Sequence, residues 1–212
     1  MNYIYEIIVV AVITAIFISK KKPKIIYLIY GYLFFFFITL IQIPIKYLEL
    51  LIINSTNTNV ILIPQIISII FFSSFTEISK YLTLKKFLHI KKINNAILFG
   101  IGWVSLKSIN TFTIIFMNYI FIQLNFTFNY NYFLKEYTFI NFIFFFIFNI
   151  YLTILIIKAI LKNNKKYFYF AIILNILISI LLIILEKTNK LILITIVSSY
   201  SLYAIFKYKN IK

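Results

Sequence analysis

The sequence contains no cysteine, which excludes disulfide bonds, thiolate metal sites and cysteine nucleophiles. It also lacks arginine and aspartate, so all 21 basic residues are lysine and all five acidic residues are glutamate. The one histidine, His89, has no second histidine with which to share a metal ion. We therefore expect no metal site and no other cofactor.

Polar residues are scarce as well. Of the 212 residues, 63% are hydrophobic and only 12% are charged, and the mean hydropathy is +0.99. A water-soluble domain of this length would need polar or small residues at roughly half of its positions. The net charge of +16 does not indicate nucleic acid as a partner, because the lysines form short clusters beside apolar runs. Such clusters are typical of membrane topology signals and of contacts with anionic lipid headgroups, so the lipid bilayer is the expected partner.

Charged and turn residues divide the chain into seven apolar segments, each near the length of roughly 20 residues that a spanning helix needs. These segments lie near residues 3–19, 25–45, 60–84, 94–122, 138–161, 167–186 and 190–207. No basic stretch precedes the first segment, so we interpret it as a retained helix rather than a secretory signal. The connections are short, and we predict one all-α domain over residues 1–212, a polytopic transmembrane bundle without an internal repeat.

Lysine is unevenly distributed between the connections. Those after the first, third and fifth segments, together with the C-terminal tail, carry fourteen lysines, whereas the opposite connections carry only Lys46, Lys135, Lys187 and Lys190. Lysine near the ends of spans is retained in the cytoplasm. We therefore predict an outside N-terminus and a cytoplasmic C-terminus. Four glutamates, Glu6, Glu49, Glu136 and Glu186, would then be solvated near the outer face, and His89 would lie in a cytoplasmic loop.

One predicted helix carries a polar stripe in an otherwise apolar segment. Residues three and four apart share a helix face, so Ser73, Thr76, Glu77 and Lys80 lie together. Ionisable groups inside a span are costly and usually face the bundle interior. Glu77 would lie about 12 Å inside the membrane boundary, at ~1.5 Å per residue. Lys80 is shallower and can extend its ammonium group to the surface.

The next predicted helix begins with two of the chain's three glycines, Gly100 and Gly102, which favour close approach of helix backbones. Trp103 and Lys107 lie on one face of that helix, and we expect Glu77 to meet this face. Two interpretations stay open. The residues form a polar chamber in the cytoplasmic half of the bundle, or a Glu77–Lys107 ion pair only fixes the register of the two helices.

These two segments resemble the YhfC-type family of glutamic intramembrane proteases, which are related to the CAAX-processing and bacteriocin-processing membrane proteases. That family carries a Glu-Glu-x-x-Arg pattern in one helix and, after a basic loop, a Gly-x-Gly-His-Gly-type segment with a later glutamate. Here Thr76-Glu77-Ile78-Ser79-Lys80 stands in the first place, and the segment from Phe99 to Ile109 stands in the second. The resemblance covers roughly 40 of the residues and implies a multi-pass protein of the bacterial plasma membrane.

The resemblance also implies a role for each position. Glu77 would be the glutamate that activates water, and Lys80 would replace the arginine of the motif. Thr76 stands where the family has its first glutamate, Trp103 where it has histidine, and Lys107 where it has the later glutamate. Tryptophan donates one hydrogen bond but has no basic lone pair, so it cannot transfer protons as histidine does. The chain therefore resembles a peptidase whose catalytic set is incomplete.

Three functions stay open from the sequence. The first is an intramembrane peptidase that cleaves a hydrophobic or membrane-tethered peptide, with Glu77 as general base. The second is a noncatalytic membrane module that binds a peptide, lipid or protein partner on the same scaffold. The third is a small transporter gated by Glu77 and Lys107, although we detect no inverted repeat. The missing histidine favours the second function, and the resemblance itself favours the first.

Overall fold

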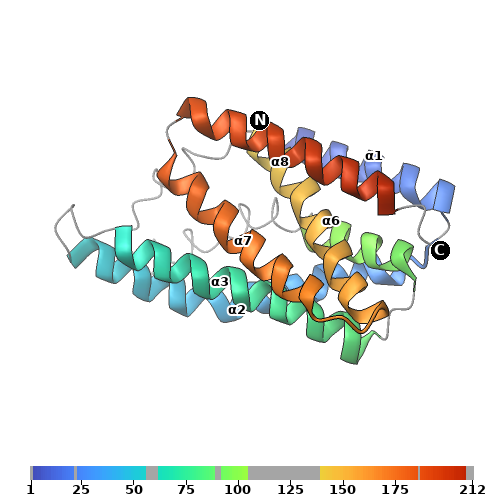
Figure 1. Cartoon of the computed structure of the whole chain (residues 1–212), viewed down its shortest axis with the longest axis horizontal. Helices are drawn as coiled ribbons and strands as arrows, with labels where there is room; N and C mark the ends of the chain where they lie inside the picture. The colour runs from blue at the N-terminus through green and yellow to red at the C-terminus, as the bar shows by residue number, and fades with distance from the viewer. Residues whose placement is uncertain are drawn as a thin grey trace.

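The computed structural model describes residues 2–21, 23–55, 62–88, 92–104, 139–185 and 187–208, and their regular structure is entirely helical. This confirms the predicted all-α class for the described part of the chain. The helices follow in the order α1 (Asn2–Lys21), α2 (Ile26–Ser55), α3 (Leu62–Leu82) with the π-helical turn η2 (Thr83–Phe87), a helix at Ile93–Val104, α6 (Phe139–Leu161), α7 (Lys166–Ile184) and α8 (Lys187–Tyr208) (Figure 1).

Most helices begin and end within a few residues of the bounds predicted from hydropathy. The clear exception is α2, which continues ten residues beyond residue 45 to Ser55. Lys46 and Glu49 interrupt the apolar run there, but both residue types are good helix formers, so the helix continues past them. The Ile93–Val104 helix starts as predicted, and the rest of the predicted 94–122 segment lies outside the described residues.

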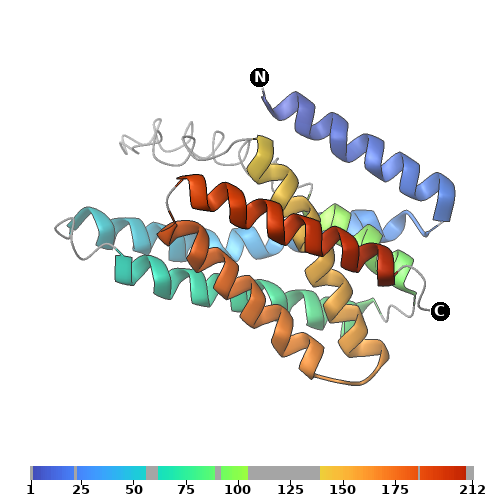
Figure 2. The same ribbon diagram turned by 45° about the horizontal axis from the view of Figure 1, so that its top comes forward.

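Among the described residues, three segments are long and apolar enough to cross a membrane: Ile143–Leu161, Lys166–Ile184 and Asn189–Lys207. The first of them belongs to α6 and is 72% buried, whereas the α7 and α8 segments are only 11% and 17% buried. Helix α6 packs against α8, α7, α3 and α1, and so forms the centre of the described bundle (Figure 2). The surrounding helices turn one apolar face towards α6 and another outwards.

The outward faces carry large apolar side chains rather than polar ones. Examples are Phe37 of α2, Phe71 of α3, Ile173 of α7 and Phe206 of α8, whose side chains are exposed. A soluble monomer rarely exposes apolar patches that extend over several elements. An exterior of this composition is suited to lipid, in agreement with the spans identified by length and hydropathy.

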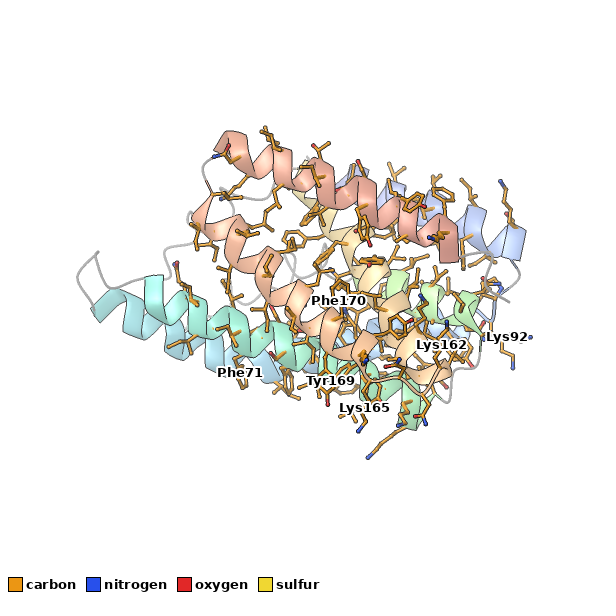
Figure 3. The ribbon with its side chains drawn as sticks, in the orientation of Figure 1. Phe71, Lys92, Lys162, Lys165, Tyr169 and Phe170 are labelled. Atoms are coloured by element: carbon orange, nitrogen blue, oxygen red, sulfur yellow. The ribbon has the colours of Figure 1, made fainter. Side chains whose placement is uncertain are left out.

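The lysine-bearing ends of the helices gather at one end of the bundle. The end of α1, the η2 turn, the α6–α7 turn and the end of α8 all lie on the right in Figure 1, and the second view agrees (Figure 2). Lys92, Lys162 and Lys165 mark this end in Figure 3. The connections that are rich in lysine in the sequence therefore also lie together at one end of the folded bundle.

The backbones of α2 and the Ile93–Val104 helix touch where glycine faces glycine. A Cβ atom at Gly31 would meet the carbonyl oxygen of Phe99 and lie 2.8 Å from the backbone nitrogen of Trp103. A Cβ atom at Gly102 would likewise meet the carbonyl oxygen of Leu28. Only hydrogen fits at either position, so the close approach expected from Gly102 is confirmed.

The third glycine packs on the opposite side of the same helix. A Cβ atom at Gly100 would lie 2.9 Å from Oγ1 of Thr153 on α6. The Ile93–Val104 helix therefore lies between two helices. Its backbone contacts the backbone of α2, and its Gly100 contacts the Thr153 side chain of α6. This double contact fixes the position of Trp103.

We predict that Gly31→Ala and Gly102→Ala each lower the free energy of unfolding in detergent by about 1–3 kcal/mol, the usual cost of overpacking. The added methyl group would press on a backbone carbonyl, which cannot move unless the whole helix moves. Gly100→Ala is the matched control and should cost less, because the methyl meets a side chain. Thermal unfolding of the three variants, followed by circular dichroism, measures the ranking. Equal losses at all three positions would show that the glycine crossing does not hold the helices together.

Candidate functional site

The polar stripe predicted on α3 faces the inside of the bundle. Ser73, Glu77 and Lys80 are buried, and the side chains of Glu77 and Lys80 have no exposed surface. Thr76 is partly buried at the edge of the stripe. The spacing of three and four residues therefore predicted the shared face, and the cost of exposing charge to lipid explains why it turns inwards.

Glu77 and Lys80 form an ion pair within α3. The Nζ atom of Lys80 donates a hydrogen bond of 2.8 Å to Oε1 of Glu77. The Lys80 ammonium does not reach the surface, although its shallower position would allow it to. A lysine side chain extends to the membrane surface when water is its best available partner, but here a carboxylate one helical turn away offers a stronger one.

Two asparagines on other helices complete the network. Nζ of Lys80 donates a second hydrogen bond, of 3.0 Å, to Oδ1 of Asn149 on α6. Nδ2 of Asn175 on α7 donates a hydrogen bond of 2.9 Å to Oε1 of Glu77. The amide of Asn149 is itself oriented, because its Nδ2 donates to the carbonyl oxygen of Phe145 at 2.9 Å. The charged pair on α3 is thus tied to α6 and α7.

Trp103 contacts the network from a fourth helix, Ile93–Val104. Its side chain is 1% exposed, and Nζ of Lys80 lies 5.5 Å from the centre of its ring, within the range of a cation–π interaction. Phe35 and Phe99 hold the indole in place, with ring centres 5.8 Å and 5.5 Å away. The α3 stripe therefore contacts Trp103 through Lys80, and the predicted meeting of Glu77 itself with this face stays a prediction.

Several predicted positions lie outside the described residues. Lys107, His89, Glu136 and Glu186 belong to this group, and the side chains of Glu6 and Glu49 are likewise not described. The Glu77–Lys107 ion pair and the solvated glutamates at the outer face therefore stay predictions.

The two oxygens of the Glu77 carboxylate have different environments. Oε1 accepts from Lys80 and Asn175, whereas Oε2 is buried and has no hydrogen-bond partner among the described residues. Within that part of the chain no three histidine, cysteine or acidic side chains come together to hold a metal ion. The geometry thus favours charge neutralisation at Oε1 and leaves Oε2 as an acceptor that could hold a water molecule.

Sequence reasoning missed Asn149 and Asn175, although a signal for both was present. Each is an amide in the middle of a helix that is otherwise almost entirely apolar, Phe139–Leu161 and Lys166–Ile184. Polar side chains in such helices commonly form hydrogen bonds between helices. Searching for amides as well as charges would have found them.

Comparison with models of known protein families, with curated proteins and with solved structures finds no match to the chain.

We predict that Lys80→Met lowers the free energy of unfolding by about 3–5 kcal/mol, because it leaves a buried carboxylate without its counter-charge. The double variant Glu77→Gln/Lys80→Met removes both charges and should recover most of that loss. Lys86→Met, at an exposed lysine on η2, is the matched control and should stay within about 0.5 kcal/mol of the native chain. Chemical unfolding in mixed micelles measures the four proteins. A double variant as unstable as Lys80→Met would argue against the ion pair as the origin of the loss.

Proposed function

We propose that the chain is a seven-span protein of the bacterial plasma membrane that has the scaffold of a YhfC-type intramembrane peptidase but does not cleave peptides. On this scaffold it binds a hydrophobic or membrane-tethered peptide or protein. Its N-terminus lies outside the cell and its C-terminus in the cytoplasm.

The observation that carries this proposal is that one oxygen of the Glu77 carboxylate already accepts two hydrogen bonds. The Lys80 ammonium lies 2.8 Å from Oε1 of Glu77. Asn149 on α6 accepts a hydrogen bond from Lys80, and Asn175 on α7 donates one to the same Oε1. A general base must instead be within hydrogen-bond reach of a water molecule and able to take its proton. A cation held at the carboxylate stabilises the ionised form and opposes that proton transfer.

The position of Trp103 supports the same conclusion. The resemblance puts a proton-transferring histidine at this position, whereas the indole ring covers the Lys80 ammonium with its π face. Here the aromatic ring contributes to the stability of the buried cation rather than to proton transfer. Water activation would depend on Glu77 alone.

One observation favours an active peptidase as a second candidate. Oε2 of Glu77 is buried and without a hydrogen-bond partner in the described part of the bundle. A water molecule at this oxygen would stand where a peptidase needs its nucleophile. The two candidates differ in whether the native protein cleaves a membrane peptide.

The proposed orientation is supported by the gathering of lysine-bearing helix ends at one end of the bundle (Figure 1). Lysine on the cytoplasmic side of a membrane is the usual determinant of orientation. The same end carries the α6–α7 turn, whereas the α7–α8 connection lies at the other end (Figure 1).

We predict that a cysteine introduced by Asn164→Cys, in the α6–α7 turn, is protected from a membrane-impermeant maleimide in intact cells and is labelled after lysis. The matched variant Asn189→Cys, at the opposite end of the span, should be labelled in intact cells. Both asparagines are exposed, and the native chain has no cysteine, so the background is low. Labelling of Asn164→Cys in intact cells would overturn the proposed orientation.

We predict no Glu77-dependent cleavage when the purified protein is incubated with a library of membrane peptides in liposomes. Loss of one general acid or base typically lowers a rate by ~10²–10⁴. Glu77→Gln is the control, and Trp103→His combined with Lys107→Glu restores the residues implied by the resemblance. Cleavage by the native chain that Glu77→Gln abolishes would contradict the noncatalytic proposal and establish the peptidase.

A further inference from the structure

The lysine-rich end of the bundle has no acidic residue to balance it. Residues 85–92 and 158–166 together contain eight lysines, and the sequence has no acidic residue between Glu77 and Glu136 or between Glu136 and Glu186. Glu77 is buried and paired with Lys80. The positive charge of these two segments must therefore be balanced by an anion from outside them.

An aromatic contact brings the two segments together. The ring of Tyr81, in the last turn of α3, packs against the ring of Phe168, in the first turn of α7, with centres 4.5 Å apart. Nζ of Lys85 donates a 3.1 Å hydrogen bond to the hydroxyl of Tyr81 and lies 5.4 Å from the centre of its ring. We call this contact the Tyr81–Phe168 seam.

Lys165 belongs to the other side of the seam. It is the N-cap residue of α7, and its carbonyl oxygen accepts hydrogen bonds from the backbone nitrogens of Phe168 and Tyr169. The side chains of Lys85 and Lys165 are both exposed. Lys85 therefore lies beside Tyr81 on one side of the seam, and the backbone of Lys165 lies beside Phe168 on the other.

Two lysines, Lys165 and Lys166, lie at the N-terminus of α7, where positive charge is unfavourable. The first turn contains no acidic residue and begins with Lys166, whose backbone nitrogen donates a 3.0 Å hydrogen bond to the neutral amide oxygen Oδ1 of Asn164. The positive end of a helix dipole is stabilised by anions and destabilised by cations. A bound anion would therefore relieve repulsion among Lys165, Lys166 and the helix end.

The surface beside these lysines fits a lipid rather than a free ion. Tyr169 and Phe170 follow directly along α7 and are 55% and 47% exposed. In the view of Figure 3, Tyr169 lies next to Lys165, and Phe170 lies farther towards the middle of the bundle. Aromatic rings adjoining lysines are typical of the interface between headgroups and acyl chains.

We propose that Lys85 and Lys165, on either side of the Tyr81–Phe168 seam, bind the phosphate of an anionic phospholipid whose acyl chains lie along Tyr169 and Phe170. The interaction does not depend on whether the protein is a peptidase. It would fix the end of α3, two residues beyond the last charge of the buried network, against the start of α7.

Native mass spectrometry of the full chain, released from an uncharged detergent after titration with phosphatidylglycerol or phosphatidylcholine, tests this proposal. Lys85→Gln/Lys165→Gln should bind phosphatidylglycerol roughly 30-fold more weakly, the expected effect of losing two lysines at an anionic membrane surface. Lys20→Gln/Lys24→Gln removes two exposed lysines from the same end of the bundle, away from the seam, and should leave the affinity unchanged. Equal weakening by both pairs would show a diffuse positive surface and overturn the proposed site.

Two further arms keep the proposal testable if the double variant folds poorly. The native chain should prefer phosphatidylglycerol to phosphatidylcholine, and the preference should fall as salt is raised. Equal affinity for the two lipids would contradict the proposal without any variant. Inorganic phosphate and glycerol phosphate should not compete with the lipid, and full competition by either would identify a site for a soluble anion instead.

Discussion

Two charges without exposed surface have to be neutralised inside the bundle, because removing each from water costs several kcal/mol. The Glu77 carboxylate and the Lys80 ammonium meet this requirement first within α3, and then through Asn149 on α6 and Asn175 on α7. Each of these hydrogen bonds fixes the rotation and depth of one helix relative to another. A lipid-facing exterior supplies little such specificity, since lipid tails are as apolar as the side chains they touch.

The remaining side of the network depends on glycine. Gly31 and Gly102 let α2 and the Ile93–Val104 helix approach until backbone meets backbone, and Gly100 fits against Thr153 of α6. That approach puts the ring of Trp103 within 5.5 Å of the Lys80 ammonium. Backbone packing, aromatic contact and ion pair therefore form one connected arrangement, in which an aromatic ring and an amide oxygen lie next to the Lys80 ammonium.

Hydropathy and lysine distribution predicted where most helices begin and end, because those bounds follow from properties local to each segment. The helical face of Ser73, Glu77 and Lys80 followed from spacing alone. The burial of Lys80 could not be predicted from its depth, since it depends on Asn149, sixty-nine residues away in sequence. The central place of α6 was equally invisible, because its composition resembles that of α7, and only packing between helices distinguishes them.

The burial of Lys80 can be measured directly with an amine-reactive reagent and peptide mapping of the native protein in detergent. Lys85 and Lys86, exposed on the next turn, are internal references for an accessible lysine. We expect both to react at once, whereas Lys80 should react only after the protein is denatured. Modification of Lys80 in the native protein at the rate of Lys85 would show that its ammonium reaches solvent and would contradict the buried network.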